Sequence, residues 1–84
     1  MKLLVSATVE PIKNGVAVRC PQLRMVGHGK EQVEAVESLR RGIRAWCLGL
    51  QRSGRLESAL GRRGMKWQPD GDGLMVEVSV PYTV

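Results

Sequence analysis

The residues of this chain that could perform acid–base or nucleophilic chemistry are few and widely spaced. The only histidine is His28, and the two cysteines, Cys20 and Cys47, lie far apart in the sequence. A Cys–His or Ser–His catalytic pair needs a base held beside its nucleophile, and no residue around His28 offers a recognisable partner. The sequence therefore predicts a protein that is not an enzyme and has no catalytic residue.

Metal and phosphate sites are equally weakly indicated. One histidine and two separated cysteines form none of the paired spacings of a zinc site. Asp70 and Asp72 lie in a Pro-Asp-Gly-Asp-Gly run that lacks the remaining ligands of a calcium loop and is more typical of a turn. Gly27-His28-Gly29 precedes a predicted helix, where a phosphate could bind, but it has no dinucleotide or Walker pattern. We expect no metal and no cofactor.

Positive charge is the most pronounced polar feature. The chain has 13 Lys and Arg against 8 Asp and Glu, a net charge of +5. Part of it is matched, because Glu37 and Arg41 are spaced for an i,i+4 ion pair on a helix. The unmatched excess could contact nucleic-acid phosphates through Arg52, Arg55, Arg62, Arg63 and Lys66.

One long amphipathic helix is predicted to position most of these side chains. Apolar residues recur at steps of three and four through residues 30–51 and share one helical face: Val33, Val36, Leu39, Ile43, Trp46, Cys47 and Leu50. Gly29 is the expected N-cap, and Gly54 is placed to end the helix. A second, short helix is expected over residues 56–61.

A line of small residues runs along the opposite face of the long helix. Its members, at spacing i, i+4, i+7 and i+11, are Ser38, Gly42, Ala45 and Gly49. Each mid-helix glycine costs about 1 kcal/mol relative to alanine. Because all four side chains are small or absent, the line would leave room for another backbone. Two interpretations stay open: tolerated surface glycines, or a docking face for a second subunit or a partner. Leu48, which points away from the main apolar face, belongs to the same candidate interface.

The rest of the chain is predicted to form strands with one buried face. Five are expected, at residues 3–10, 16–21, 22–26, 65–68 and 74–80. The first two form a hairpin turned at Lys13-Asn14-Gly15. Pro11 and Pro81 limit strands, and the glycines at 27 and 29 end the third one. The order predicts one α+β domain over residues 1–84, a two-layer sandwich of a small antiparallel sheet packed on one long helix.

The expected compartment is reducing. No run approaches the roughly 18 apolar residues of a membrane span, and the N-terminus lacks the long apolar region and cleavage site of a signal peptide. Cys20 and Cys47 both lie on apolar faces and are most simply buried free thiols, with a disulfide as the alternative. We therefore expect a cytoplasmic protein with no membrane segment.

Three motifs in residues 3–50 occur together. Pro21-Gln22-Leu23 follows the first hairpin, Gly29 precedes Glu34-Ala35-Val36, and Ile43 occupies an aliphatic position further along the helix. In this order and spacing they resemble the N-terminal domain of the HicB-type antitoxins. The sequence departs from that family at Lys30-Glu31, where the family usually has Asp-Thr.

The resemblance implies a β-β-β-α-β fold like a reduced ribonuclease-H sheet without its catalytic carboxylates. It also implies a protein that binds and neutralises a small, mRNA-cleaving, HicA-like toxin. Many members of the family add a C-terminal DNA-binding module, and we expect none here. The expected function is thus that of a non-enzymatic interaction domain, a homodimer or higher homo-oligomer. The alternative is a basic nucleic-acid-binding domain that contacts phosphates without catalysis.

Overall fold

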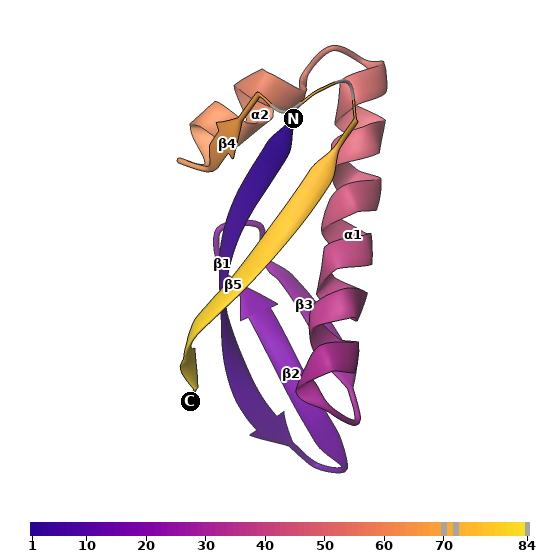
Figure 1. Cartoon of the computed structure of the whole chain (residues 1–84), viewed down its shortest axis with the longest axis vertical. Coiled ribbons are helices and arrows are strands. Elements are labelled where there is room, and N and C mark those ends of the chain that lie inside the picture. Colours follow the sequence, from indigo (N-terminus) through magenta and orange to yellow (C-terminus); the bar gives the residue numbers. More distant parts are fainter. Residues whose placement is uncertain (70, 72, 84) are drawn as a thin grey trace.

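Over the residues that the structure describes, the fold consists of one sheet and two helices (Figure 1). The structure is a computed structural model that describes residues 1–69, 71 and 73–83, with the backbone alone for 81–83. In chain order the elements are β1 (Lys2–Ile12), β2 (Gly15–Cys20), β3 (Met25–Gly29), α1 (Gln32–Arg52), α2 (Leu56–Arg62), β4 (Lys66–Gln68) and β5 (Met75–Thr83).

β1 is the central strand, and both of its edges are used. β2 and β4 pair antiparallel with one edge, β2 along residues 8–12 and β4 along residues 2–4. β5 pairs parallel with the other edge along residues 2–9. β3 pairs antiparallel with β2. The strands therefore lie in the order β3-β2-β1-β5, and β4 extends the sheet beside the beginning of β1.

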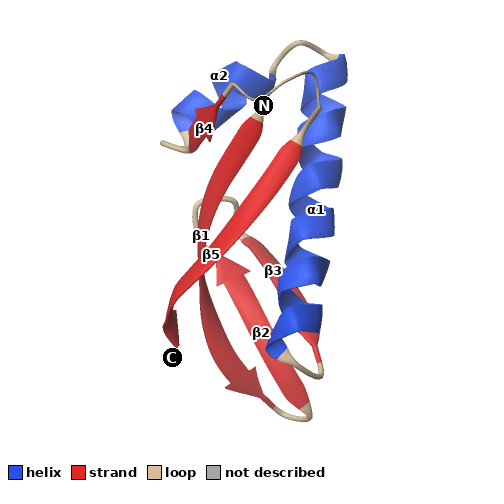
Figure 2. Cartoon of the chain, in the orientation of Figure 1, coloured by secondary structure: helices blue, strands red, loops and turns tan. Residues whose placement is uncertain are grey.

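α1 lies across one face of this sheet, which gives the molecule its two layers (Figure 2). The predicted α+β two-layer sandwich is thus confirmed, although one pairing differs from the expected antiparallel sheet. β3 runs in the same direction as β1, and α1 then carries the chain back along the sheet. β5 consequently starts at the same end as β1 and pairs with it in parallel.

The core lies between α1 and the inner face of the sheet. On β1 the predicted alternation is confirmed, because one side chain in two is at most 5 % exposed: Leu3, Val5, Ala7 and Val9. On α1 the most buried line, each member at most 1 % exposed, consists of Ala35, Leu39, Ile43 and Cys47. These two rows face each other and form the apolar contact that holds the layers together.

Gly27 marks the closest approach between β3 and α1. A Cβ added there would lie 2.5 Å from the backbone nitrogen of Leu39, and one added to Gly29 would lie 2.6 Å from that of Ala35. The prediction that these glycines end the third strand holds for Gly29, the last residue of β3, and is wrong for Gly27, which lies inside the strand. β3 begins at Met25 because residues 21–24 form a turn, and both positions lack a side chain because the helix packs directly on them.

The start of α1 also differs from the expectation. The N-cap is Glu31 rather than Gly29, and the first helical residue is Gln32. Val33, predicted to lie on the buried face, is 77 % exposed. Its neighbour Ala35 takes the position against the sheet, and two residues correspond to about 200° of helical rotation, so Val33 must point away.

The end of α1 is as predicted. Gly54 has a φ of +72°, the left-handed conformation that favours glycine. Its N–H donates to the carbonyl of Gln51 at 3.1 Å, and the N–H of Arg55 donates to that of Leu50 at 3.0 Å. α2 then runs one residue further than expected.

In the part of the chain that the structure describes, neither helix combines the length and the apolar character needed to cross a membrane.

Two prolines expected to limit strands lie inside them. Pro11 is paired with Val16 in β1, and β5 follows β1 only as far as Val9, so no described strand lies on the other side of Pro11. Pro81 lies in β5, an edge strand, where the register along β1 shifts. At each of these positions, one side of the strand has no described neighbouring strand that needs an amide donor. Sheets tolerate proline at such positions.

Candidate functional site

The first candidate surface is the line of small residues on α1, which we call the small-residue line: Ser38, Gly42, Ala45 and Gly49. All four are exposed, and Leu48 beside them is half-buried. Helical spacing alone predicted that these residues share a flank of α1, and the structure places them there. Whether they contact a partner or a second subunit remains a prediction.

The glycines of this line have no role in packing within the described chain. A Cβ added at Gly42 or at Gly49 would meet no atom within 4 Å. Gly27, in contrast, is required by the packing of α1 on β3. Because a glycine inside a helix costs about 1 kcal/mol relative to alanine, Gly42 and Gly49 weaken α1 without improving any described contact of the fold.

The two flanks of α1 face different surroundings. Arg40 and Arg44 line one groove together with residues 74–77 beside β5. On the other side, Ser38 lines a groove with His28 of β3. The small-residue line therefore begins on the flank of α1 that is turned towards β3, and the arginines lie on the flank that is turned towards β5.

His28 is exposed on β3, and it shares its groove with Glu34, Glu37 and Ser38. Among the described residues, no hydrogen bond or ion pair joins its ring to any of these side chains. Glu37 instead pairs with Arg40, at 3.0 Å, so the i,i+4 partner predicted for it, Arg41, is not the one it uses. The groove thus holds polar groups that are not arranged as a nucleophile and its base.

The second candidate surface is the basic cluster after α1. Its members are exposed, and they come from the end of α1, from α2 and from β4, which lie at the upper end of the molecule in Figure 1: Arg52, Arg55, Arg62, Arg63 and Lys66. No ion pair with a described carboxylate involves any of them. The structure therefore brings the predicted cationic residues to one end of the molecule.

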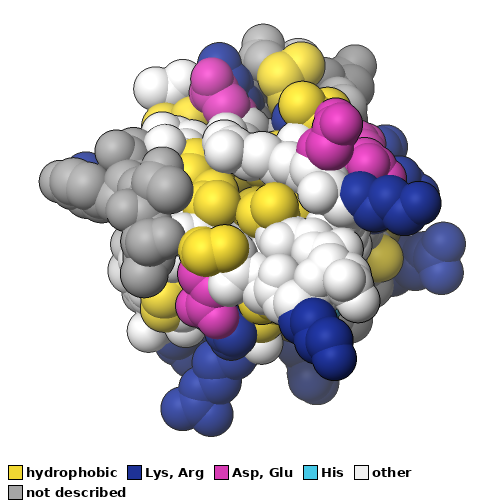
Figure 3. Space-filling view, turned by 90° about the horizontal axis from the view of Figure 1, so that it is seen from below, with side chains coloured by type: hydrophobic (Ala, Val, Ile, Leu, Met, Phe, Trp, Pro, Cys, Tyr) yellow, Lys and Arg dark blue, Asp and Glu magenta, His cyan; other side chains and the backbone are white. Residues whose placement is uncertain are grey.

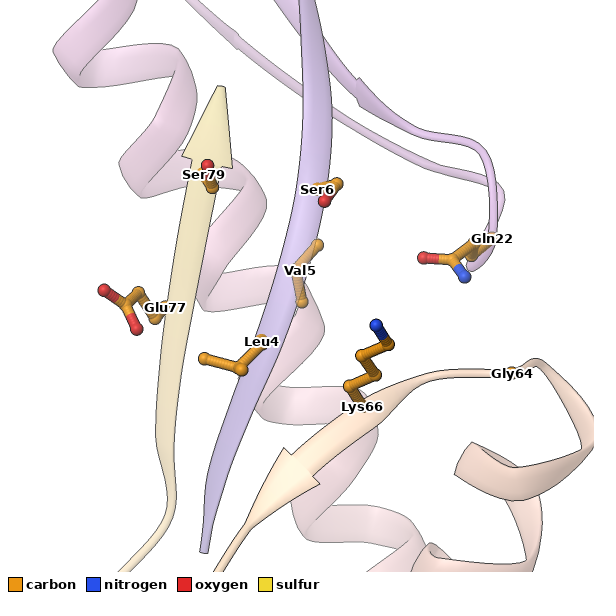
Figure 4. Close-up of a pocket in the computed structure, with 8 residues that line it drawn as sticks. All are labelled: Leu4, Val5, Ser6, Gln22, Gly64, Lys66, Glu77 and Ser79. Carbon is orange, nitrogen blue, oxygen red and sulfur yellow. The ribbon is translucent and has the colours of Figure 1, made fainter. Parts of the chain in front are cut away.

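Two members of the cluster have specific surroundings that the sequence did not indicate. The Arg63 guanidinium lies 5.1 Å from the ring centroid of Trp46, a cation–π contact that connects the end of α2 to α1. Lys66 lines a pocket of about 420 Å³ on the outer face of the sheet. Figure 4 shows that its side chain and that of Gln22 reach into this pocket from opposite sides.

This pocket exists because β1 has an incomplete edge. β4 pairs with β1 only along residues 2–4 and β2 only along residues 8–12, so residues 5–7 lie between the two partners. The Gln22 amide also donates to the Arg63 carbonyl at 3.4 Å, which joins the turn before β3 to the end of α2. Sequence reasoning did not find this pocket, because it depends on strand order.

A further surface that the sequence did not indicate is the lower end of the molecule. Figure 3 shows hydrophobic side chains gathered in the middle of this end, with charged side chains around them. The β1–β2 turn and the start of α1 meet there (Figure 1). These segments carry two large exposed apolar residues, Ile12 at 37 % and Val33 at 77 %.

Three ionisable groups among the described residues have shifted pKa values: Glu10, Arg19 and Cys47. The Arg19 side chain donates two hydrogen bonds of 3.0 Å to the Glu10 carboxylate, and they lower the pKa of Glu10. Burial raises the pKa of the Cys47 thiol to about 11. Both cysteines are buried and free, as predicted. A protonated, inaccessible thiol is a poor nucleophile and a poor metal ligand.

No described group of three His, Cys, Asp or Glu side chains is arranged to hold a metal ion. Asp70 and Asp72, interpreted above as turn residues, lie outside the described residues.

The chain has no significant match to any protein-family model, any curated protein or any solved structure. The fold and the exposed residues define an α+β domain with an open helix flank and a basic end.

Proposed function

We propose that this protein is a non-enzymatic interaction domain of the antitoxin kind. In this proposal the small-residue line of α1 binds a small toxin of the HicA-like type and thereby prevents it from cleaving mRNA. The observation that carries the proposal is the empty space over Gly42 and Gly49. These glycines lower the stability of α1 and improve no contact within the described chain. A partner that approaches the helix backbone there would explain why glycine occupies both positions.

The element order gives a second, independent support. The chain has three strands, then the long helix, then a last strand beside β1, which is the order that the resemblance to HicB-type antitoxins implies. α2 and β4 lie between the helix and the last strand as an addition to that order.

The binding experiment compares three forms of the tagged protein in lysate of its host, each with and without nuclease. The wild type is expected to retain one small protein after nuclease treatment. Gly42→Leu is expected to lose it, because the leucine fills the space over the helix. Gly61→Leu is the matched control: it is also a helical glycine with nothing within 4 Å of an added Cβ, but it lies on α2.

Retention of the same partner by Gly42→Leu, with the folded state verified by circular dichroism, would contradict the assignment of the site to α1. A wild type that retains no nuclease-resistant protein would contradict the proposed function itself.

The second candidate function is nucleic-acid binding through the basic end. It is favoured by the exposed Arg52, Arg55 and Arg62, none of which pairs with a described carboxylate. Phosphate contacts release counterions, so the affinity for RNA or DNA should fall steeply as salt rises. Replacing the three arginines by alanine should abolish binding at low salt. Absence of binding by the wild type at low salt would exclude this function.

A further inference from the structure

β1 has one residue without a described strand partner on the edge that β2 and β4 share. β2 pairs with β1 as far as Thr8, and β4 pairs with it as far as Leu4. Cys20 is the next residue of β2, and Met65 is the residue before β4. A single position, opposite Ser6, therefore lies between the two partner strands, and we call it the Ser6 gap. Ser6 is also part of the lining of the pocket on the outer face of the sheet.

The backbone groups of Ser6 face this gap. At the start of β1, Met1 directs its backbone towards β5, because its amino group donates to the Gly73 carbonyl at 2.7 Å and its carbonyl accepts from the Met75 N–H at 2.9 Å. Successive residues of a strand direct their backbone groups to opposite edges. The odd-numbered residues at the start of β1 thus face β5, and the N–H and C=O of Ser6 point to the other edge, into the gap.

The turns beside the gap do not supply a partner for these groups. Pro21, the residue after β2, has no N–H to donate. Gly64, two residues before β4, donates its N–H to the Gly61 carbonyl at 3.1 Å. No turn hydrogen bond among the described residues reaches Ser6. A backbone donor and acceptor side by side on a strand are the groups that pair with the backbone of another extended residue.

The side chains around the gap place donors at one end and an acceptor at the other (Figure 4). Because β1 runs from the β4 side to the β2 side, the Ser6 N–H lies towards Lys66 and the Ser6 C=O towards Gln22. The Gln22 nitrogen donates to the Arg63 carbonyl at 3.4 Å, and its oxygen is directed at β1. One end of the gap thus offers an N–H and an ammonium group, and the other end offers two oxygens.

The charges of the lining restrict the ligand. Lys66 forms no ion pair with a described carboxylate, whereas Glu77 is paired with Lys2 at 3.1 Å and points away from the gap in Figure 4. The donor end therefore favours a carboxylate, and the acceptor end favours an ammonium group. An α-amino acid carries these two groups on one carbon, which is the spacing of the backbone that would pair with Ser6.

We propose that the Ser6 gap binds a free L-α-amino acid in the conformation of a strand residue paired with Ser6. Its carboxylate accepts from the Ser6 N–H and the Lys66 ammonium group. Its own ammonium group donates to the Ser6 carbonyl and to the Gln22 Oε1. This site uses β1, β4 and the turn before β3, and not the small-residue line of α1, so the inference does not depend on the proposed function.

The pairing also predicts which stereoisomer binds. Residues opposite each other in an antiparallel pair have their side chains on the same face. The side chain of an L-amino acid would thus lie beside that of Ser6, which is exposed. The side chain of a D-amino acid would point to the inner face, where Val5 is 2 % exposed and belongs to the core. The site should therefore select handedness and the two charged groups rather than the side chain.

An NMR titration of isotope-labelled protein with L-alanine tests the proposal. We expect the backbone amide signal of Ser6 and the side-chain amide signals of Gln22 to shift and to saturate with a dissociation constant in the millimolar range, because so small a ligand makes few contacts. D-alanine is the matched control and should leave these signals unshifted. N-acetyl-L-alanine, which has no ammonium group, should bind about tenfold more weakly or worse.

A variant pair tests the donor end. Lys66→Gln removes its charge, and the dissociation constant for L-alanine should rise about tenfold or more. Lys13→Gln, the same change in the exposed β1–β2 turn, should leave it unchanged.

An unshifted Ser6 amide at about 50 mM L-alanine, a concentration that would nearly saturate a millimolar site, would overturn the proposal. So would equal binding of the two alanine enantiomers, or a Lys66→Gln protein that binds as the wild type does. Equal binding of N-acetyl-L-alanine and L-alanine would also overturn it, and would assign the gap to the carboxyl terminus of a peptide.

Discussion

Replacing Gly27 by alanine tests the contact that positions α1 on the sheet. The new Cβ would lie 2.5 Å from the Leu39 nitrogen and 2.8 Å from the Leu39 Cβ. Favourable contacts between such atoms begin near 3.5 Å, so α1 and β3 must separate by about 1 Å. The atoms on the helix side are mainly backbone, and they cannot yield as the end of a flexible side chain can.

The expected magnitude follows from two opposing effects. Overpacking of this kind costs up to about 3 kcal/mol. Alanine is favoured over glycine in a strand by about 0.5–1 kcal/mol. We expect a net destabilisation of about 2 kcal/mol, which for a domain of this size corresponds to a melting temperature lower by about 8–16 °C.

Gly42→Ala is the matched control. It adds the same methyl group to a glycine that has open space around it. The gain in helix propensity is about 1 kcal/mol, so this variant should melt higher than the wild type. Urea and thermal unfolding followed by circular dichroism measure both variants. A Gly27→Ala protein as stable as the wild type would refute the close packing of α1 on β3.

Two further predictions concern the shifted pKa values. The Arg19 hydrogen bonds lower the pKa of Glu10, so their stabilisation is present above the ordinary value of 4.5 and is lost as pH falls through the lowered value. The stability difference between the wild type and Glu10→Gln should therefore shrink in acid, and a difference independent of pH would contradict the ion pair. Burial raises the pKa of Cys47 to about 11, so the folded state loses stability as pH rises from 9.0 towards that value. Folded protein at pH 9.0 should react slowly with iodoacetamide and unfolded protein rapidly; equal rates would show that the thiol is accessible.

Local patterns were sufficient to predict much of the fold. The alternation in β1 and the three-and-four spacing in α1 are properties of single segments, and both elements occur where those patterns indicate. The end of α1 was likewise predicted from adjacent residues alone, because Gly54 is placed for the left-handed conformation that ends a helix. Segment type follows from which face of a segment is apolar, and this can be read without knowing its neighbours.

Features that depend on neighbouring segments could not be predicted. Gly27 looked like a strand end because its need for a glycine arises only when α1 folds back onto β3. Val33 looked buried because its exposure depends on how α1 is rotated to place Ala35 against β3. The parallel pairing of β5 depends on the path of the whole chain.

The candidate sites show the same division. The small-residue line follows from helical spacing and was predicted on one flank of α1. The contact of Arg63 with Trp46 and the position of Lys66 opposite Gln22 depend on how α2 and β4 return to the sheet. The gap opposite Ser6 depends on the strand pairing, which spacing in the sequence does not contain.

The measurement that tests the central claim most directly is an RNA-cleavage assay. The small protein captured by the wild type is purified and mixed with mRNA and rising amounts of this chain. We expect the captured protein to cleave mRNA alone and to lose that activity as the chain reaches a stoichiometric amount, with Gly61→Leu inhibiting as the wild type does and Gly42→Leu failing to inhibit. Cleavage that continues undiminished in excess wild-type protein, or a captured protein that does not cleave RNA, would contradict the antitoxin function.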